Sequence, residues 1–377
     1  MKQLLAILII LFLNSCITNE ERDSYLIEGT LKNIPDGTII DLSLHIGRNG
    51  QRINSDTIID GRFKFNDTLK IRPSKMSLKF RDGKNYYGSC DLWVDYEVIK
   101  VDGYSKYPTS WVVTGKNKEQ VALNSIKNKI RKIETKKDSI RLLIKNSLKG
   151  ADATELLWDA FDSVETIANA IELKAIEENP NSLSAIEILY RNAKFDSTIT
   201  KNQIKKIYDK LDTSYQKTIF AEGLLSIIQE KNIPEIGDSM TNIVAFDPDG
   251  KKYDLNGFKG KYILLDFWAS ACAPCVQALP ETRNLYANNN EQLTIIGVNM
   301  DDNLDLWKKS SQRHNITWEN ISDGKGSIAG ASAEYGIKVF PTYFLIDPNG
   351  TIIDKWIGYE PNELTEKMSQ HIKELKI

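Results

Sequence analysis

One stretch of the chain constrains the fold more than any other, residues 264–275, with the sequence LLDFWASACAPC. It begins inside a short apolar run, Tyr262–Leu265, whose length and composition are typical of a buried β-strand. Cys272 and Cys275 follow at the C-x-x-C spacing, where a helix that runs through Val276 is expected to begin. The stretch therefore predicts a strand that leads into a helix, with both cysteines at the start of that helix.

The position of the two cysteines favours a redox-active pair of thiols. The thiolate is the attacking species in thiol–disulfide exchange, and the unpaired N–H groups and the dipole at a helix N-terminus favour the anion. Cys272 is therefore the expected nucleophile. Cys275, one turn further along and less exposed, is the expected resolving thiol that attacks the mixed disulfide. Pro274, between them, is expected to shape the turn and to tune the potential.

Residues 1–15 are predicted to be a lipoprotein signal peptide. The apolar run Leu4–Leu13 is too short to span a bilayer as a helix, but it fits the hydrophobic region of a signal peptide. The segment Leu13–Cys16 resembles a bacterial lipobox, in which the cysteine becomes acylated. Cys16 would then anchor the protein to a membrane, with residues 16–23 as a tether. Plain secretion with a free Cys16 is the alternative.

Composition argues against two further kinds of site. The formal net charge is −2, and no block of Lys and Arg with interleaved aromatic residues suggests nucleic-acid binding. The three histidines, His45, His314 and His371, are too widely separated in sequence to suggest a metal site. A length of 377 residues is enough for two or three domains, each with a core of its own.

The pattern along the chain predicts a multi-domain protein. Alternating apolar and polar runs with turn signals such as Asp60-Gly61 predict an N-terminal antiparallel β sandwich or barrel-like domain over residues 24–115, in which Cys90 is expected to be a buried, inert thiol. Apolar residues at helical spacing predict a middle α-helical region and linker over residues 116–235. There an intramolecular helical hairpin is favoured over a coiled-coil dimer seam. Residues 236–377 show the order β-α-β-α-β-β-α of a layered α/β domain, in which the terminal helix is expected over Asn362–Leu375.

Several separated motifs of this last domain resemble the thioredoxin superfamily. They are Asp266-Phe267-Trp268-Ala269 before the cysteines, Pro280 after them and Phe340-Pro341-Thr342 at the start of a later strand. An upstream hairpin, Gly260-Lys261 and the turn Asp347–Gly350 narrow the resemblance to exported TlpA/ResA-like thiol–disulfide oxidoreductases. The segment 24–115 resembles a domain of unknown function that commonly precedes a thioredoxin-like domain in envelope proteins of Gram-negative bacteria.

The resemblance implies a thioredoxin-like fold for residues 236–377, with the Cys272–Cys275 disulfide as redox centre and no other cofactor. It places Asp266 as a buried carboxyl whose raised pKa would let it accept the proton of Cys275. A polar strand end satisfied by a backbone group is the alternative for Asp266. It also implies that Pro341 is a cis-proline beside the dithiol. The residues expected to contact substrate are Trp268, Pro274, Phe340, Pro341 and Thr342.

These features predict a membrane-anchored enzyme that reduces or isomerises disulfides of envelope proteins, on the periplasmic side of a Gram-negative cell envelope. The family implies a transmembrane thiol carrier as electron donor. Cytochrome c maturation is disfavoured, because Ala278 stands where relatives with that role carry a glutamate. Two alternatives are a binding or adaptor lipoprotein with a vestigial redox site and a peroxiredoxin-like peroxidase, although no P-x-x-x-T-x-x-C motif precedes Cys272.

Overall fold

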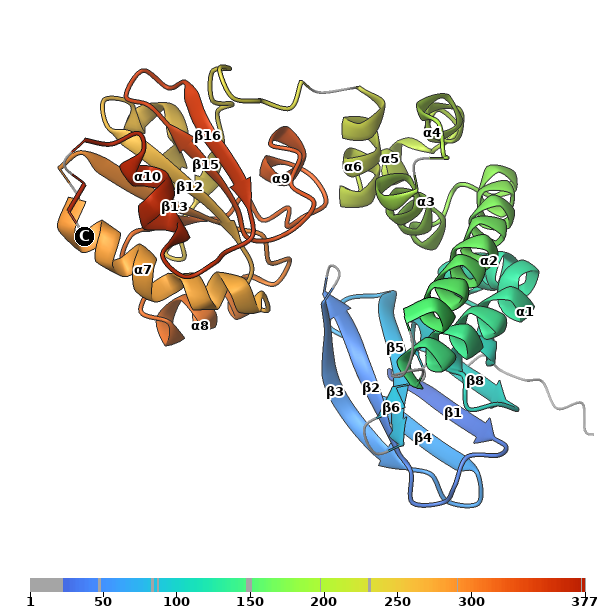
Figure 1. The fold of residues 1–377 in the computed structure, drawn as a ribbon. Coiled ribbons are helices and arrows are strands. Elements are labelled where there is room, and N and C mark those ends of the chain that lie inside the picture. Colours follow the sequence, from blue (N-terminus) through green and yellow to red (C-terminus); the bar gives the residue numbers. More distant parts are fainter. Residues whose placement is uncertain are drawn as a thin grey trace, which may run out of the picture.

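The computed structural model describes residues 23–46, 49–82, 85–86, 88–146, 151–196, 198–229, 232–289, 291–373 and 375–376. Within these residues the chain forms a β-rich N-terminal region, a helical middle region and an α/β C-terminal region (Figure 1). The predicted signal peptide, residues 1–15, and the predicted lipid-carrying Cys16 lie outside the described residues. In the described part, no helix combines the length and the apolar character needed to cross a bilayer.

Two sheets that share one apolar core make up the N-terminal region. The first sheet has the strand order β4-β1-β8-β9, with β4 at Arg62–Asp67, β1 at Tyr25–Leu31, β8 at Val98–Gly103 and β9 at Val112–Thr114. The second has the order β3-β2-β5-β6, with β3 at Asn49–Thr57, β2 at Ile39–Ile46, β5 at Ser74–Asp82 and β6 at Asn85–Tyr86, while β7 at Cys90–Val94 also pairs with β5. Side chains of both sheets, such as Ile27, Phe65, Leu42 and Leu78, pack into the same core. The predicted sandwich-like packing therefore fits this region.

One pair of strands departs from the predicted antiparallel arrangement. β1 and β8 run parallel, with Ile27 opposite Ile99 and Gly29 opposite Val101. Parallel neighbours need a long crossover connection, and here the whole second sheet lies between the two strands in sequence. Alternation of apolar and polar residues is the same in a parallel and an antiparallel strand, so the pattern predicted the strands and not their direction.

The middle region is a set of helices that pack through their apolar faces. They are α1 at Lys118–Asn146, α2 at Ala151–Glu178, α3 at Leu183–Phe195, α4 at Lys201–Tyr208, α5 at Thr213–Gln216 and α6 at Ile219–Ile228. The consecutive helices α1 and α2 pack along each other within the chain, as expected for a helical hairpin. Ser182, Thr200 and Thr218 cap α3, α4 and α6, because each hydroxyl accepts a backbone N–H of the first turn.

A five-stranded sheet forms the centre of the C-terminal region, in the order β14-β13-β12-β15-β16. The strands are β12 at Tyr262–Trp268, β13 at Leu293–Asn299, β14 at Glu319–Ile321, β15 at Thr342–Ile346 and β16 at Ile352–Ile357. β12 lies in the middle, parallel to β13 and antiparallel to β15, and only Tyr262 of its residues is not buried. The predicted buried strand is confirmed, whereas the three-residue β14 was not predicted.

Short elements and helices surround this sheet. They are β10 at Val244–Phe246, β11 at Lys252–Asp254, the 3₁₀ turn at Leu255–Phe258, α7 at Ala273–Asn289, α8 at Leu304–Arg313, α9 at Ala331–Glu334 and α10 at Glu363–Ser369. The terminal helix was expected to reach Leu375 but ends at Ser369. The side chain of Asn289, at the end of α7, accepts a hydrogen bond from the backbone N–H of Lys376 and donates one to the Lys376 carbonyl, which ties Lys376 to α7.

The C-terminal region packs against the helical region through the segment between β14 and α9. Ile328 and Ala329 of this segment are buried in the apolar core built by α3, α4 and α6. The carbonyl oxygen of Ser327 accepts hydrogen bonds from the Tyr190 hydroxyl at 3.1 Å and from the Lys194 ammonium at 2.7 Å. Both donors belong to α3. The contact therefore joins two regions that are far apart in sequence.

Candidate active site

The two cysteines lie where β12 ends and α7 begins, as predicted. Cys272 and Cys275 form a disulfide, with their Cα atoms 5.3 Å apart. Cys275 is buried in the first turn of α7, and Cys272 is only half-buried. The backbone N–H of Cys275 donates to the Cys272 Sγ atom at 3.2 Å. In the reduced protein, a Cys272 thiolate would still accept this hydrogen bond and lie at the positive end of the helix dipole. Both interactions stabilise the thiolate.

A buried carboxylate that the sequence analysis did not single out holds the turn before Cys272. Asp301, just beyond β13, accepts hydrogen bonds from the Ser270 backbone N–H at 3.0 Å and from the Ser270 hydroxyl. The Asn299 side chain donates to the same carboxylate at 2.9 Å. Because β12 and β13 are parallel, the residues that follow them meet at one edge of the sheet. That rule, applied to the two strands, could have identified Asp301.

Asp266 lies beneath the first turns of α7. Alternation along β12 puts Leu264, Asp266 and Trp268 on one face of the sheet. Leu264 packs in one cluster with Ala278 and Leu279 of α7, and Trp268 packs in another with Cys275. Asp266, between them, is 3 % exposed, and its Oδ1 atom has no hydrogen-bond partner among the described residues.

Burial alone raises the pKa of Asp266 to about 7. A charged carboxylate loses its hydration in this apolar environment, so the neutral form is favoured. The alternative of a strand end satisfied by a backbone group does not fit, because Asp266 lies inside β12 with both neighbouring strands paired to it. A carboxyl with a pKa near neutrality can both accept and release a proton at pH 7.

The loop before β15 completes the surroundings of the disulfide. The Phe340–Pro341 peptide bond is cis, as the resemblance predicts. Phe340 is half-buried and packs in one cluster with Trp268, Cys272 and Cys275. Pro274 is exposed in the first turn of α7, whereas Thr342 is buried at the start of β15, where its hydroxyl donates to the carbonyl of Val339 at 2.8 Å. The structure thus brings Phe340 and Trp268 to the disulfide. Trp268 was expected to contact substrate, but it is 2 % exposed, and Thr342 is buried as well, so neither side chain is accessible to a protein substrate.

Two tryptophans lie against the disulfide, and only Trp268 was expected there. The Trp268 Nε1 atom donates to Asn320 at 3.1 Å, and Asn320 in turn donates to the Ser311 hydroxyl at 2.8 Å, which fixes the indole. Trp307, on α8, belongs to the same cluster and is 2 % exposed. The amphipathic pattern of α8 identifies Trp307 as a core residue, but only the fold places it beside the cysteines.

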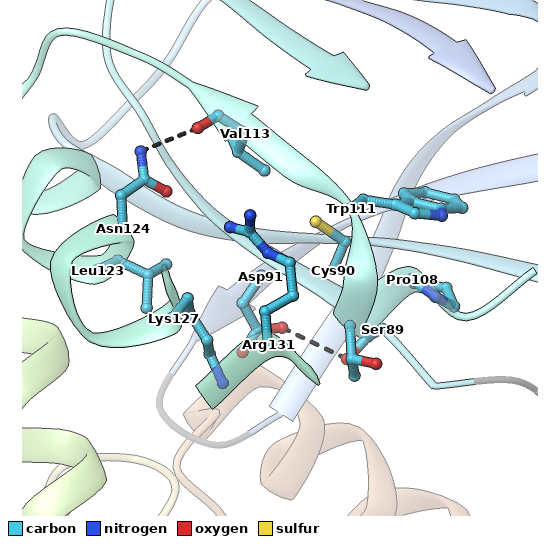
Figure 2. Close-up of a pocket in the computed structure, with 11 residues that line it drawn as sticks. Ser89, Cys90, Asp91, Pro108, Trp111, Val113, Leu123, Asn124, Lys127 and Arg131 are labelled. Atoms are coloured by element: carbon cyan, nitrogen blue, oxygen red, sulfur yellow. Dashed lines mark hydrogen bonds between the residues drawn. The ribbon is translucent and has the colours of Figure 1, made fainter. Parts of the chain in front are cut away.

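Cys90 is separate from this centre. It lies in β7, is 5 % exposed and lines a pocket of about 50 Å³ between β7 and α1 (Figure 2). Burial raises the pKa of the Cys90 thiol to about 12, so the thiol stays protonated. The expectation of a buried thiol is confirmed. In the part of the chain that the structure describes, no group of His, Cys, Asp and Glu side chains is arranged to hold a metal ion.

Comparisons with known proteins find relatives for the C-terminal region. Residues 235–371 match the family model described as Redoxin. The chain is 31% identical over 144 residues to the thiol-disulfide oxidoreductase ResA of a Bacillus cereus strain, a match that covers 38% of this chain and 82% of that protein. It is 28% identical over 160 residues to ResA of Geobacillus thermodenitrificans, covering 42% and 86%. The solved thioredoxin domain of a thiol-disulfide oxidoreductase from Bacteroides vulgatus is 28% identical, covers 37% of this chain and 99% of that chain, and superposes with a TM-score of 0.35.

The buried carboxyl predicts a loss of stability as the pH rises. In the folded, oxidised protein Asp266 keeps its proton up to its pKa of about 7, whereas in the unfolded chain it ionises near pH ~4. The folded state therefore binds more protons between these values. The free energy of unfolding should fall by roughly 4 kcal/mol across this interval and stay level above it. We expect Asp266→Asn to remove this fall, which urea unfolding of the oxidised proteins at pH 4, 6 and 8 would measure.

Asp249→Asn, in the exposed turn after β10, is the matched control and should retain the pH dependence of the unchanged protein. If Asp266→Asn and the unchanged protein lost stability in parallel between pH 4 and pH 8, Asp266 would not hold a proton in the folded state.

Proposed function

Because the chain belongs to the TlpA/ResA-like thiol–disulfide oxidoreductases of the thioredoxin superfamily, we propose that it reduces or isomerises disulfides of envelope proteins through Cys272 and Cys275. One observation carries the proposal: a half-buried sulfur at the start of α7 is bonded to a buried sulfur, and a buried carboxyl lies on the sheet face beneath that helix. A static bridge needs neither the unequal exposure nor the carboxyl. Nothing in the site favours an adaptor or a peroxidase over this function.

The first step of the proposed reaction forms a mixed disulfide. The Cys272 thiolate of the reduced protein attacks one sulfur of a substrate disulfide, and the other substrate sulfur leaves as a thiolate that takes a proton. The N–H of Cys275 at 3.2 Å and the N-terminal end of α7 lower the free energy of the attacking thiolate. The half-buried position of Cys272 leaves its sulfur accessible to a protein substrate.

The second step releases the substrate. Asp266, as a carboxylate, accepts the proton of the Cys275 thiol, and the Cys275 thiolate attacks Cys272. The Cys272–Cys275 disulfide forms again, and the substrate leaves with its second sulfur reduced. Two electrons have then moved from the dithiol to the substrate. A pKa of about 7 suits this role, since the carboxylate form is populated at neutral pH and the proton is released again after the step.

The substrate-binding surface is proposed to be the loop that ends in the cis-proline. Phe340 packs beside both cysteines, and Val339 before it is 50% exposed. An extended substrate segment could lie along this loop and pair with its backbone groups. Pro274, exposed between the cysteines, would complete the surface, with Pro341 and Thr342 holding the loop and the buried Trp268 packing against Cys275. The buried Ala278 offers no carboxylate, which favours general disulfides over cytochrome c maturation.

We further propose that Cys16 is acylated and anchors the protein on the periplasmic side of a Gram-negative envelope membrane. The sequence Leu13–Cys16 supports the anchor, and the proposed electron donor is a transmembrane thiol carrier. A Cys16→Ser variant should then appear in the soluble fraction of the cell envelope, because it lacks the acyl chains. If this variant stayed in the membrane fraction after a high-salt wash, the anchor would be wrong.

The order of attack gives a direct test of the redox function. A reduced Cys275→Ser variant should accumulate a mixed disulfide with a disulfide-containing protein, because nothing resolves the bond at Cys272. Cys272→Ser should accumulate little, since its remaining thiol is buried. Non-reducing gel electrophoresis followed by mass spectrometry measures both products. Cys90→Ser is the control and should behave as the unchanged protein. Equal trapping by the Cys272→Ser and Cys275→Ser variants would refute the assigned roles.

A further inference from the structure

Asp266 belongs to a row of three side chains that crosses the C-terminal sheet. In the strand register Asp266 of β12 lies opposite Tyr343 of β15, and Tyr343 lies opposite Trp356 of β16. Directly opposed residues point to the same face of a sheet, and their Cβ atoms are about 5 Å apart. The rings of Tyr343 and Trp356 stack with centroids 5.2 Å apart. Both rings belong to the apolar cluster on the α7 side of the sheet, the side to which Asp266 also points.

Each member of this row carries a buried polar atom without a hydrogen-bond partner among the described residues. The atoms are the Oδ1 of Asp266, the hydroxyl of Tyr343 and the Nε1 of Trp356. Tyr343 is fully buried, and Asp266 and Trp356 are 3 % and 7 % exposed. A buried polar group without a partner reduces stability, so apolar side chains of the same shape would give the more stable sheet. Three such atoms in one cross-strand row point to a role in the chemistry.

The groups around the row keep the Tyr343 hydroxyl protonated, so that it can donate a hydrogen bond but does not give up its proton. The titratable groups that act on it are Asp266, Glu281 of α7, Tyr359 after β16 and Glu363 of α10. Burial first, and then the negative charges of these groups, raise the pKa of Tyr343 far above its usual value, so the hydroxyl keeps its hydrogen. Glu281 already accepts hydrogen bonds from Tyr359 at 2.9 Å and from Thr365. The Tyr343 hydroxyl makes no hydrogen bond to Glu281.

We propose that the Tyr343 hydroxyl supports the Asp266 carboxylate whenever Asp266 is ionised, directly or through one water molecule, and so sets the pH at which Asp266 can accept the proton of Cys275. Tyr343 is then a positioning residue for the release step. The inference rests on the proposed role of Asp266 as proton acceptor. The physical reason is that a buried, ionised carboxylate needs a hydrogen-bond donor. Tyr343, the residue directly opposite Asp266 in the sheet, has such a donor in its hydroxyl. Trp356 is one strand further away, behind the Tyr343 ring.

Tyr343→Phe tests the inference in the full chain, because it removes the hydroxyl and keeps the ring. Loss of the donor should raise the pKa of Asp266 by about one pH unit, which carboxyl ¹³C NMR of the oxidised protein measures. The pH profile of substrate release should move to higher pH by the same amount. At pH 7 the carboxylate fraction of Asp266 should then fall from about one half to about one tenth, so release should be about fivefold slower, while formation of the mixed disulfide keeps its rate. At pH 5, where Asp266 is protonated in the folded protein, the free energy of unfolding should not fall, since the hydroxyl has no partner to lose.

Tyr335→Phe is the matched control, since it removes a buried hydroxyl on the opposite face of the sheet. The Tyr335 hydroxyl donates to the Thr241 carbonyl at 2.6 Å, so this variant should lose stability and leave the pKa of Asp266 unchanged. If Tyr343→Phe leaves that pKa and the release profile unchanged while Asp266→Asn slows release, the inference is wrong and the proposed function stands. If Asp266→Asn slows neither step, the proposed role of Asp266 fails, and the inference fails with it.

Discussion

The C-terminal region depends on one constraint. Its central strand, β12, is buried on both faces and is paired along both edges. β13 and β15 satisfy its backbone, and two apolar clusters cover its sides. A strand in this position is held rigidly, so the residues that follow it have a fixed place. These residues are the turn at Ser270, which Asp301 holds through hydrogen bonds, and the two cysteines of the disulfide. The same burial raises the free energy of the ionised form of Asp266, and this gives the carboxyl a pKa of about 7.

A second constraint joins the three regions of the chain through α3. On one side the Trp93 indole of β7 donates to Ser184 at 2.6 Å, which ties the β-rich region to the start of α3. On the other side Ile328 is buried against α3 and α6, and Gly223 of α6 permits this approach because a Cβ there would lie 2.8 Å from the Ile328 carbonyl oxygen. The segment that contains Ile328 leads, within the same connection, to the cis-proline loop beside the disulfide. The helical region therefore contacts the C-terminal region at the connection that carries the proposed substrate-binding loop.

Local patterns in the sequence were enough to predict the strand β12, the helix α7, the two cysteines where they meet and the buried carboxyl of Asp266. Each is encoded within a few residues, by an apolar run, a C-x-x-C spacing or a single Asp in a strand. Features that depend on pairing between distant segments were not predictable. The parallel direction of β1 and β8, the register that sets Tyr343 opposite Asp266 and the contact of Ile328 with α3 all belong to this class.

The central claim is that Cys272 and Cys275 form a working redox couple, and the reduction potential of this pair tests it most directly. The purified protein would be equilibrated in graded dithiol/disulfide buffers, the thiols alkylated and the two forms counted by mass spectrometry. The account predicts a reversible two-electron midpoint between about −120 and −270 mV, the range of thiol–disulfide oxidoreductases that exchange with protein substrates. A disulfide that stays oxidised below about −300 mV would behave as a structural bridge and would contradict the account.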